Sequence, residues 1–215
     1  MKKAPLKLTI EPTTAVHQYN ADTKRGGADS LYGQLKVMGK LLVWNKIKEK
    51  LFEKEGRKCW ICGVENTRLN AHEFWKYLPG RQIARNYKGE PIGSYRVKRL
   101  AAIHHLCIDC HMVKHADLVL LEEESIFSSP ISRHECIDAR LERARELKEK
   151  REKLVEHFCK VNQCPREVFY QYWHIVRGRI KRIQKEIHWE PDYGKYGDLL
   201  KALDRQPNVS PQPRY

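Results

Sequence analysis

Four cysteines in the middle of the chain have the spacing of ligands to one metal ion. The first pair is Cys59-Trp60-Ile61-Cys62 and the second is Cys107-Ile108-Asp109-Cys110. Each Cys-x-x-Cys pair places two sulfurs on a tight turn, and two such turns complete the tetrahedral site that zinc prefers. The entropy of closing the loop between them grows slowly with loop length, and thiolate–zinc bonding outweighs it. We therefore predict a structural Zn²⁺ on Cys59, Cys62, Cys107 and Cys110, with buried free thiols as the alternative.

Three histidines near these cysteines have the positions expected of a second metal site. His111 and His115 are four residues apart on an expected helix, so both rings project from one face. A strand passing in front of that helix would supply His72. Three neutral imidazoles leave coordination positions open for water and a phosphate oxygen, which suits hydrolysis. In the alternative interpretation, His111 caps the helix and His115 lies on the surface.

The charge of the chain indicates a polyanionic partner. Among 215 residues there are 41 Lys and Arg against 27 Asp and Glu, which gives a net charge of +14. A field of this sign attracts nucleic acid, and an anionic membrane surface is the alternative.

Other features of the composition indicate a compartment. No apolar run is long enough to cross a membrane, and Met1–Leu6 lacks the apolar core of a signal peptide. We therefore expect a soluble, cytoplasmic protein with no membrane partner. Seven cysteines, an odd number in a reducing compartment, favour thiolates and metal over disulfides.

Several expected elements would position the cysteines and histidines. Apolar residues at three- and four-residue spacing predict a helix over 40–55, with Trp44 in the core and Gly56 at its end. Strands are expected over 68–74 and from Tyr95 to His104, and a helix begins near Cys107. Between the strands we expect a basic, glycine-containing loop.

The sequence pattern predicts that the second half of the chain is helical. Helices are predicted from Arg133 to Cys159 and from Pro165 to Ile187, with a shorter one over 196–204. The first two helices carry apolar stripes and would form an antiparallel hairpin with one shared seam. The predicted class is α+β and mostly helical. In it, a small ββα-metal or zinc-ribbon module is flanked by an N-terminal helix and the C-terminal antiparallel helical hairpin.

Three consecutive regions follow from this pattern. Residues 1–39 would be an N-terminal strand and arm, with the strand at Lys7–Ile10 and a polar loop at Asp22–Asp29. Residues 40–121 would be the zinc module, and residues 122–215 a helical region with a flexible tail. Ser128–Ser132 reads as a linker.

Basic residues in two places could hold a phosphate backbone without reading the base sequence. One set is on the loop between the strands and the other shares one face of the last long helix; a solvated face is the alternative for the second set. The residues are Arg81, Arg85, Lys88, Arg177, Lys181 and Lys185.

The central stretch resembles the HNH nuclease family, the ββα-metal fold in its cysteine-supported form. In that family a paired motif on the first strand is followed by a helix that opens with Cys-x-x-Cys-His and carries a second histidine. The resemblance implies that His72, His111 and His115 bind the catalytic metal and that Glu73 occupies the general-base position. The family usually has a histidine at that position, and it has an asparagine where this chain has Ala102.

The wider chain is similar to a bacterial and phage group usually labelled HNH endonuclease. The shared features are Trp44, His72-Glu73-Phe74-Trp75, Val161-Asn162, Trp173 and Trp189-Glu190-Pro191-Asp192-Tyr193.

The resemblance implies a metal-dependent HNH-type nuclease that hydrolyses phosphodiester bonds in DNA. Besides the structural Zn²⁺, catalysis would use a second divalent ion: Mg²⁺, Mn²⁺, Ni²⁺ or Zn²⁺. Glu73 would activate or orient the attacking water, or would itself bind the metal beside His72. Either His104 or His105 could replace it as base; the alternative for that pair is one ring packed inward and one in solvent. The alternative function is a non-catalytic nucleic-acid-binding or interaction protein on the same zinc scaffold. RNA in place of DNA, and a homodimer formed through the C-terminal helices, are further alternatives.

Overall fold

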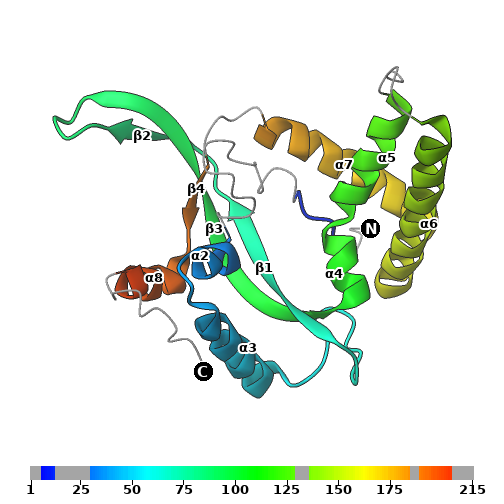
Figure 1. Ribbon diagram of the computed structural model, residues 1–215, viewed down its shortest axis with the longest axis horizontal. Coiled ribbons are helices and arrows are strands. Elements are labelled where there is room, and N and C mark those ends of the chain that lie inside the picture. Colours follow the sequence, from blue (N-terminus) through cyan, green and yellow to red (C-terminus); the bar gives the residue numbers. More distant parts are fainter. Residues whose placement is uncertain (1–5, 13–29, 129–135, 185–188, 205–215) are drawn as a thin grey trace, which may run out of the picture. The chain divides into compact units, whose positions relative to one another are not determined.

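The chain is α+β and mostly helical, as predicted, in a computed structural model that describes residues 6–12, 30–128, 136–184 and 189–204 (Figure 1). The predicted loop at Asp22–Asp29, the linker beyond Ser128 and the tail after Gln206 lie outside the described residues. Within the described part, no helix is long and apolar enough to span a membrane.

Two compact units make up the fold, and both draw on separate stretches of the chain. The first unit contains residues 1–16, 57–70 and 106–185, and we call it the cysteine unit. The second contains residues 17–56, 71–105 and 186–215, and we call it the sheet unit. The three predicted regions followed the chain in order, whereas these two units alternate along it.

The strands belong mainly to the sheet unit. β1 (Leu69–Tyr77), β3 (Pro91–Cys107) and β2 (Gln82–Arg85) are neighbours in that order. β2 pairs with β3 antiparallel, with Gln82 opposite Tyr95. β4 (Trp189–Asp192), which the sequence analysis did not predict, pairs with β3 in parallel.

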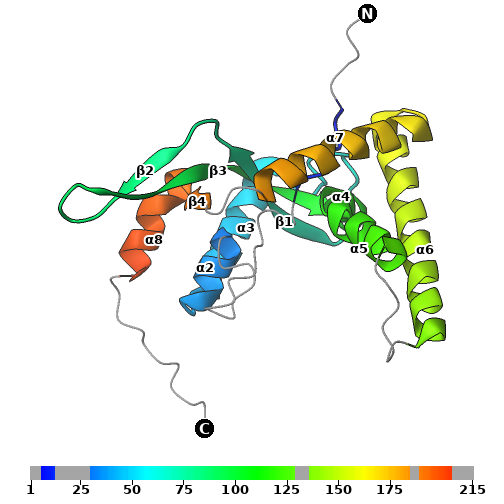
Figure 2. The same ribbon diagram turned by 90° about the horizontal axis from the view of Figure 1, so that it is seen from above.

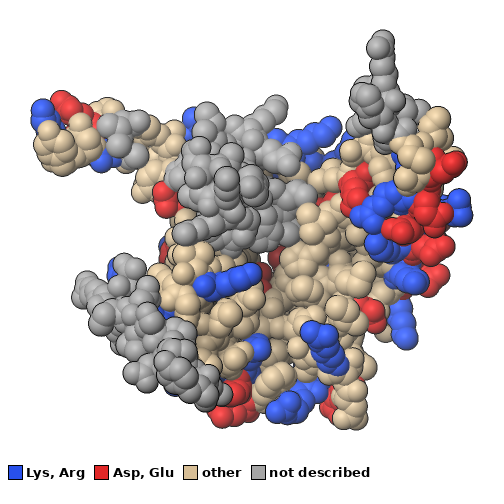
Figure 3. All heavy atoms as spheres, viewed as in Figure 1, with Lys and Arg blue, Asp and Glu red and all other residues tan. Residues whose placement is uncertain are grey.

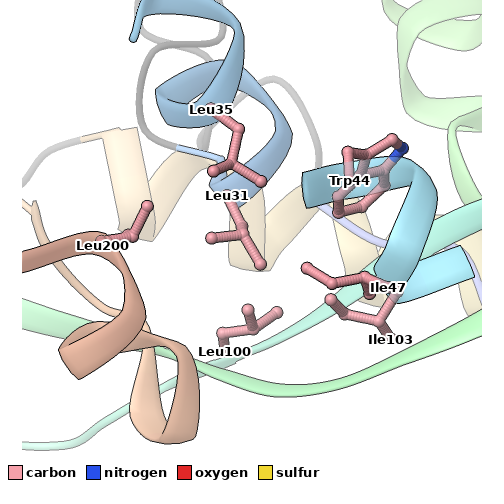
Figure 4. Close-up of a cluster of buried hydrophobic side chains, with 7 residues drawn as sticks. All are labelled: Leu31, Leu35, Trp44, Ile47, Leu100, Ile103 and Leu200. Atoms are coloured by element: carbon pink, nitrogen blue, oxygen red, sulfur yellow. The ribbon is translucent and has the colours of Figure 1, made fainter. Parts of the chain in front are cut away.

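Three helices of the sheet unit cover one face of this sheet (Figures 1 and 2). They are α2 (Leu31–Val37), α3 (Leu41–Glu55) and α8 (Gly197–Asp204), and the short 3₁₀ helix η1 (Gly194–Tyr196) leads into α8. Trp44 is a core residue, as predicted (Figure 4). The buried side chains that meet in this core are Leu31, Leu35, Trp44, Ile47, Leu100, Ile103 and Leu200.

The cysteine unit is built mainly from helices. They are α4 (Ile108–Lys114), α5 (Ala116–Ser128), α6 (Ile137–Asn162) and α7 (Arg166–Gln184).

α5 and α6 run antiparallel, as two cross-helix contacts show. Glu122 pairs with Arg143 at 2.6 Å, whereas the later carbonyl of Ile126 accepts from the earlier Arg140. The predicted hairpin pairs α6 with α7 instead. Those two helices do pack together, with the rings of Phe158 and Phe169 5.1 Å apart, and α7 crosses α6 near its end (Figures 1 and 2).

The predicted strand at Lys7–Ile10 is wrong, because residues 6–12 form no regular element. Leu8 and Ile10 are nevertheless buried. The side chain of Asn162 satisfies both backbone polar groups of Leu8, as a partner strand would. It accepts from the Leu8 amide at 3.0 Å and donates to the Leu8 carbonyl at 2.9 Å. Leu8 and Ile10 are buried at alternate positions, which is the pattern that a half-buried strand also gives.

The predicted loop between the two strands is also partly wrong. β2 and the first residues of β3 form a hairpin there, so β3 begins at Pro91 instead of near Tyr95. Residues 82–90 are mostly polar and show no apolar–polar alternation long enough to predict a strand from sequence.

Candidate metal centre and nucleic-acid-binding residues

Four sulfurs of the cysteine unit lie together in the geometry of a metal site. The Sγ atoms of Cys59, Cys62, Cys107 and Cys110 are all within 4.8 Å of one another, and those of Cys62 and Cys107 are 3.7 Å apart. Sulfurs about 2.3 Å from a tetrahedral zinc stand about 3.8 Å apart. The cluster therefore fits a metal ion of zinc's size, and the predicted metal-binding role of these four residues is supported by their arrangement.

Local backbone structure explains how each pair presents its sulfurs. In the first turn, the Gly63 amide donates to the Cys59 carbonyl at 2.9 Å, and Gly63 has a φ of +75° that favours glycine. In the second, Cys107 is the N-cap of α4, and its Sγ accepts from the Cys110 amide. Both pairs are thus held by their own turns.

The thiols in this cluster cannot all ionise without a cation. A hydrogen bond from the Cys110 thiol lowers the pKa of Cys59 to about 4. The same hydrogen bond raises the pKa of Cys110, and burial raises the pKa of Cys107 to about 12. One thiolate therefore disfavours ionisation of the neighbouring thiols. A bound divalent cation would offset the repulsion between the thiolate charges.

His157 is a neighbour of this cluster that the sequence analysis missed. Its Nε2 lies 3.2 Å from Sγ of Cys110, and burial lowers the pKa of the ring. A neutral imidazole with its proton on Nε2 would donate to the thiolate, as outer ligands of metal sites commonly do. His157 lies within the charged repeat of α6, and no local spacing ties it to the cysteines.

His111 and His115 are brought together within the cysteine unit, as predicted for one face of a helix. Their ring centroids are 4.7 Å apart, and both residues are half-buried. His115 is the C-cap of α4, and its amide donates to the carbonyls of His111 and Met112. The helix that supplies Cys110 to the cluster therefore also supplies His111, and its C-cap residue supplies the second imidazole.

His72 is a residue of the sheet unit, where it is only 4% exposed on β1. Its ring lies edge-on to Phe74, with centroids 5.0 Å apart, and Phe74 lies edge-on to His104 at 5.3 Å. His72 and His104 therefore flank one aromatic ring. The role of His72 as a third metal ligand stays a prediction.

Glu73 is held by the first turn of α2. Its two carboxylate oxygens accept from the amides of Leu31 and Tyr32, each at 2.9 Å. Successive residues of a strand face opposite sides, and Ala71 and Trp75 pack against the core beneath the helices, so Glu73 lies on the helical side and His72 on the other. Burial raises the pKa of Glu73 despite these hydrogen bonds. Its role as general base stays a prediction, and the structure gives the same carboxylate a capping function.

The two alternative bases have different surroundings. His105 is fully buried and stacks on Phe52, with ring centroids 3.7 Å apart. His104 is only half-buried, and its Nδ1 lies 2.8 Å from a carboxylate oxygen of Glu55. An ionised carboxylate at Nδ1 accepts the proton of that nitrogen and so orients the ring.

The predicted nucleic-acid-binding residues lie in three different environments. Arg81, Arg85 and Lys88 are exposed on the hairpin of β2 and β3, and Lys181 is exposed on α7. Arg177 forms an ion pair with Glu124 at 2.7 Å. Lys185 lies outside the described residues.

The exposed surface of α5 and α6 does not present charges of one sign. α5 and α6 carry a mixture of both signs (Figure 3), with pairs such as Arg143 with Glu146 and Arg145 with Glu142. Surface pairs of this kind contribute little to stability and leave little net field.

Comparisons of the chain with family models, with curated proteins and with solved structures gave no match. The family resemblance therefore rests only on the residues and motifs of this sequence.

Proposed function

We propose that this chain is a metal-dependent HNH-type nuclease that hydrolyses phosphodiester bonds in DNA. The observation that supports it most is the His111–His115 pair, because α4 and its C-cap residue bring the two imidazoles together on the same short helix that begins at Cys107 and contains Cys110. A structural zinc site would need none of these histidines, since four thiolates already complete a tetrahedron.

His111 and His115, joined by His72, would hold the second divalent ion. That ion, Mg²⁺, Mn²⁺, Ni²⁺ or Zn²⁺, would polarise the scissile phosphate and stabilise the leaving oxygen. The four-cysteine cluster would bind Zn²⁺ and fix the start of α4, so that the two rings keep one orientation.

We assign the role of general base to His104 in preference to Glu73. His104 already has the carboxylate partner that orients a catalytic imidazole, at 2.8 Å from Glu55. Nε2 would then take the proton of the attacking water. Glu73 has a raised pKa that suits a base, but both of its oxygens are engaged by amides of α2.

Free thiols and a DNA substrate are consistent with action in the cytoplasm, where cysteines stay reduced. The exposed cations of the hairpin and of α7 would contact phosphates without reading base sequence.

The test is plasmid nicking by zinc-loaded protein with each candidate ion added in turn. The parent chain is expected to nick DNA only with an added ion, and the double variant His111→Ala/His115→Ala should lose that activity while keeping its zinc. His174→Ala, which removes an exposed histidine of α7, is the matched control. Normal cleavage by the double variant would overturn the proposal.

The second candidate is a non-catalytic, zinc-containing nucleic-acid-binding protein on the same scaffold. The contacts of Glu73 favour this candidate. The residue at the family's general-base position binds two backbone amides of α2, which is a structural role and not a catalytic one. One tightly held zinc, DNA binding and no cleavage with any ion would select this candidate. Competition between DNA and RNA over a salt series would identify the preferred nucleic acid.

A further inference from the structure

The hairpin formed by β2 and the first residues of β3 ends in an exposed aromatic side chain. β2 pairs with β3 from Gln82 opposite Tyr95 to Arg85 opposite Pro91. This hairpin extends past the other strands and helices of the sheet unit (Figure 1). Tyr87 at its tip is 92% exposed. A tyrosine that contributes so little to the core is free to contact another molecule.

Hydrogen bonds make the tip a defined turn. The Gly89 amide donates to the Asn86 carbonyl, and Oδ1 of Asn86 accepts from the amides of Lys88 and Glu90. Arg85 Nη1 donates to the Gly89 carbonyl at 2.6 Å. Gly89 has a φ of +81°, as expected for the left-handed position that closes such a turn. Tyr87 and Lys88 are therefore the central residues of an ordered turn, which lowers the entropic cost of binding through them.

The charge around Tyr87 is basic. Arg81, Arg85 and Lys88 are exposed along the hairpin. The one acidic residue of this stretch, Glu90, accepts a hydrogen bond from the Asn86 side chain at 2.7 Å. The Lys88 ammonium lies 5.6 Å from the centre of the Tyr87 ring. An exposed ring beside cations is the combination by which proteins hold an unpaired nucleotide, with the ring against the base and the cations on phosphate.

We propose that this hairpin binds unpaired nucleotides of a DNA strand, with the base stacked on Tyr87 and the adjacent phosphates held by Lys88 and Arg81. This rests on the proposed function only in taking DNA as the ligand. Stacking needs an open base face, which a fully paired duplex offers only at its ends. The substrate of the proposed nuclease would accordingly be DNA with a single-stranded segment.

The first measurement is fluorescence anisotropy with a labelled single-stranded oligodeoxynucleotide and with the same strand annealed to its full complement as a blunt-ended duplex, without added divalent ions. Tyr87→Ala should weaken single-strand binding by about 5-fold to about 100-fold, which corresponds to the loss of one base–aromatic stack. Duplex binding should change by less than about 2-fold. Tyr87→Phe keeps the ring and should bind as the parent does. Tyr170→Ala, which removes an exposed tyrosine of α7, is the matched control.

The second measurement separates this inference from the proposed nuclease activity. Hydrolysis of bis(p-nitrophenyl) phosphate needs no contact with the hairpin, so Tyr87→Ala should retain the parent's rate. If the parent hydrolyses neither this ester nor DNA, the nuclease proposal fails while the anisotropy result still decides the role of the hairpin. Unchanged single-strand binding by Tyr87→Ala, or an equal loss on the duplex, would overturn the inference.

Discussion

At the scale of single residues, Glu73 and His104 show how a neighbouring group changes what a side chain can do. Glu73 lies where the family resemblance expects a base, but the open amides at the N-terminus of α2 bind its two oxygens. Such amides have no partner within their own helix, and a carboxylate there also interacts favourably with the helix dipole. His104 gains from Glu55 the orientation that a base requires.

Substitution of these two residues should therefore separate stability from catalysis. Glu73→Gln keeps the shape but loses one amide partner, so we expect it to lower the free energy of unfolding by about 1 kcal/mol. The folded variant should still cleave DNA. His104→Gln should reduce the cleavage rate by about 10²-fold to about 10⁴-fold with little change in stability. Urea unfolding and nicking rates measure both effects, and the reverse pattern would return the base role to Glu73.

At the scale of elements, α6 shows which part of an apolar stripe is buried. The stripe predicted for it comprises Leu141, Ala144, Leu147, Leu154 and Phe158. Phe158 is fully buried and its ring meets Phe169 and Tyr172, whereas Leu141 is 56% exposed. α7 packs on the C-terminal half of α6, so the same periodicity is buried at one end of the helix and exposed at the other.

Side-chain truncations at the two ends of this stripe should lower the free energy of unfolding by unequal amounts. Phe158→Ala removes a buried ring and should lower the free energy of unfolding by about 3–5 kcal/mol. Leu141→Ala shortens a side chain that is largely in water, and its effect should stay within about 0.5 kcal/mol. Chemical unfolding followed by circular dichroism compares them directly. Similar costs for the two variants would mean that Leu141 is covered in solution.

At the scale of the whole molecule, the two units differ in the groups that they offer to a metal ion and in the make-up of their cores. The cysteine unit contains all four clustered thiols, while the core of the sheet unit is formed by apolar side chains such as Trp44 and Leu100. Metal that binds only the folded state contributes its binding free energy to the unit that holds it.

Removal of zinc should therefore loosen one unit before the other. Metal analysis of the protein without added ions should give one zinc per chain, and Cys110→Ser should reduce it. After chelation, amide hydrogen exchange should rise most in residues 57–70 and in α4, while α3 stays protected. Equal loss of protection in α3 would show that the sheet unit also needs the metal.

The sequence by itself determined the features that depend on local chemistry. Each Cys-x-x-Cys turn sets the positions of its two sulfurs through the local backbone of four residues. The apolar residues of α3 and α7 recur with helical spacing, and this spacing specifies a helix whatever element it packs against. The paired rings of His111 and His115 follow from one turn of helix.

Only the tertiary structure decided the features that depend on contacts between distant residues. Glu73 meets α2 across a sequence separation of 42 residues, and His157 meets Cys110 across 47. β4 pairs with the middle of β3, although its residues show no strand pattern of their own. Such contacts form only when folding brings both partners into the same buried region. The residue pattern within either segment carries no information about that long-range packing energy.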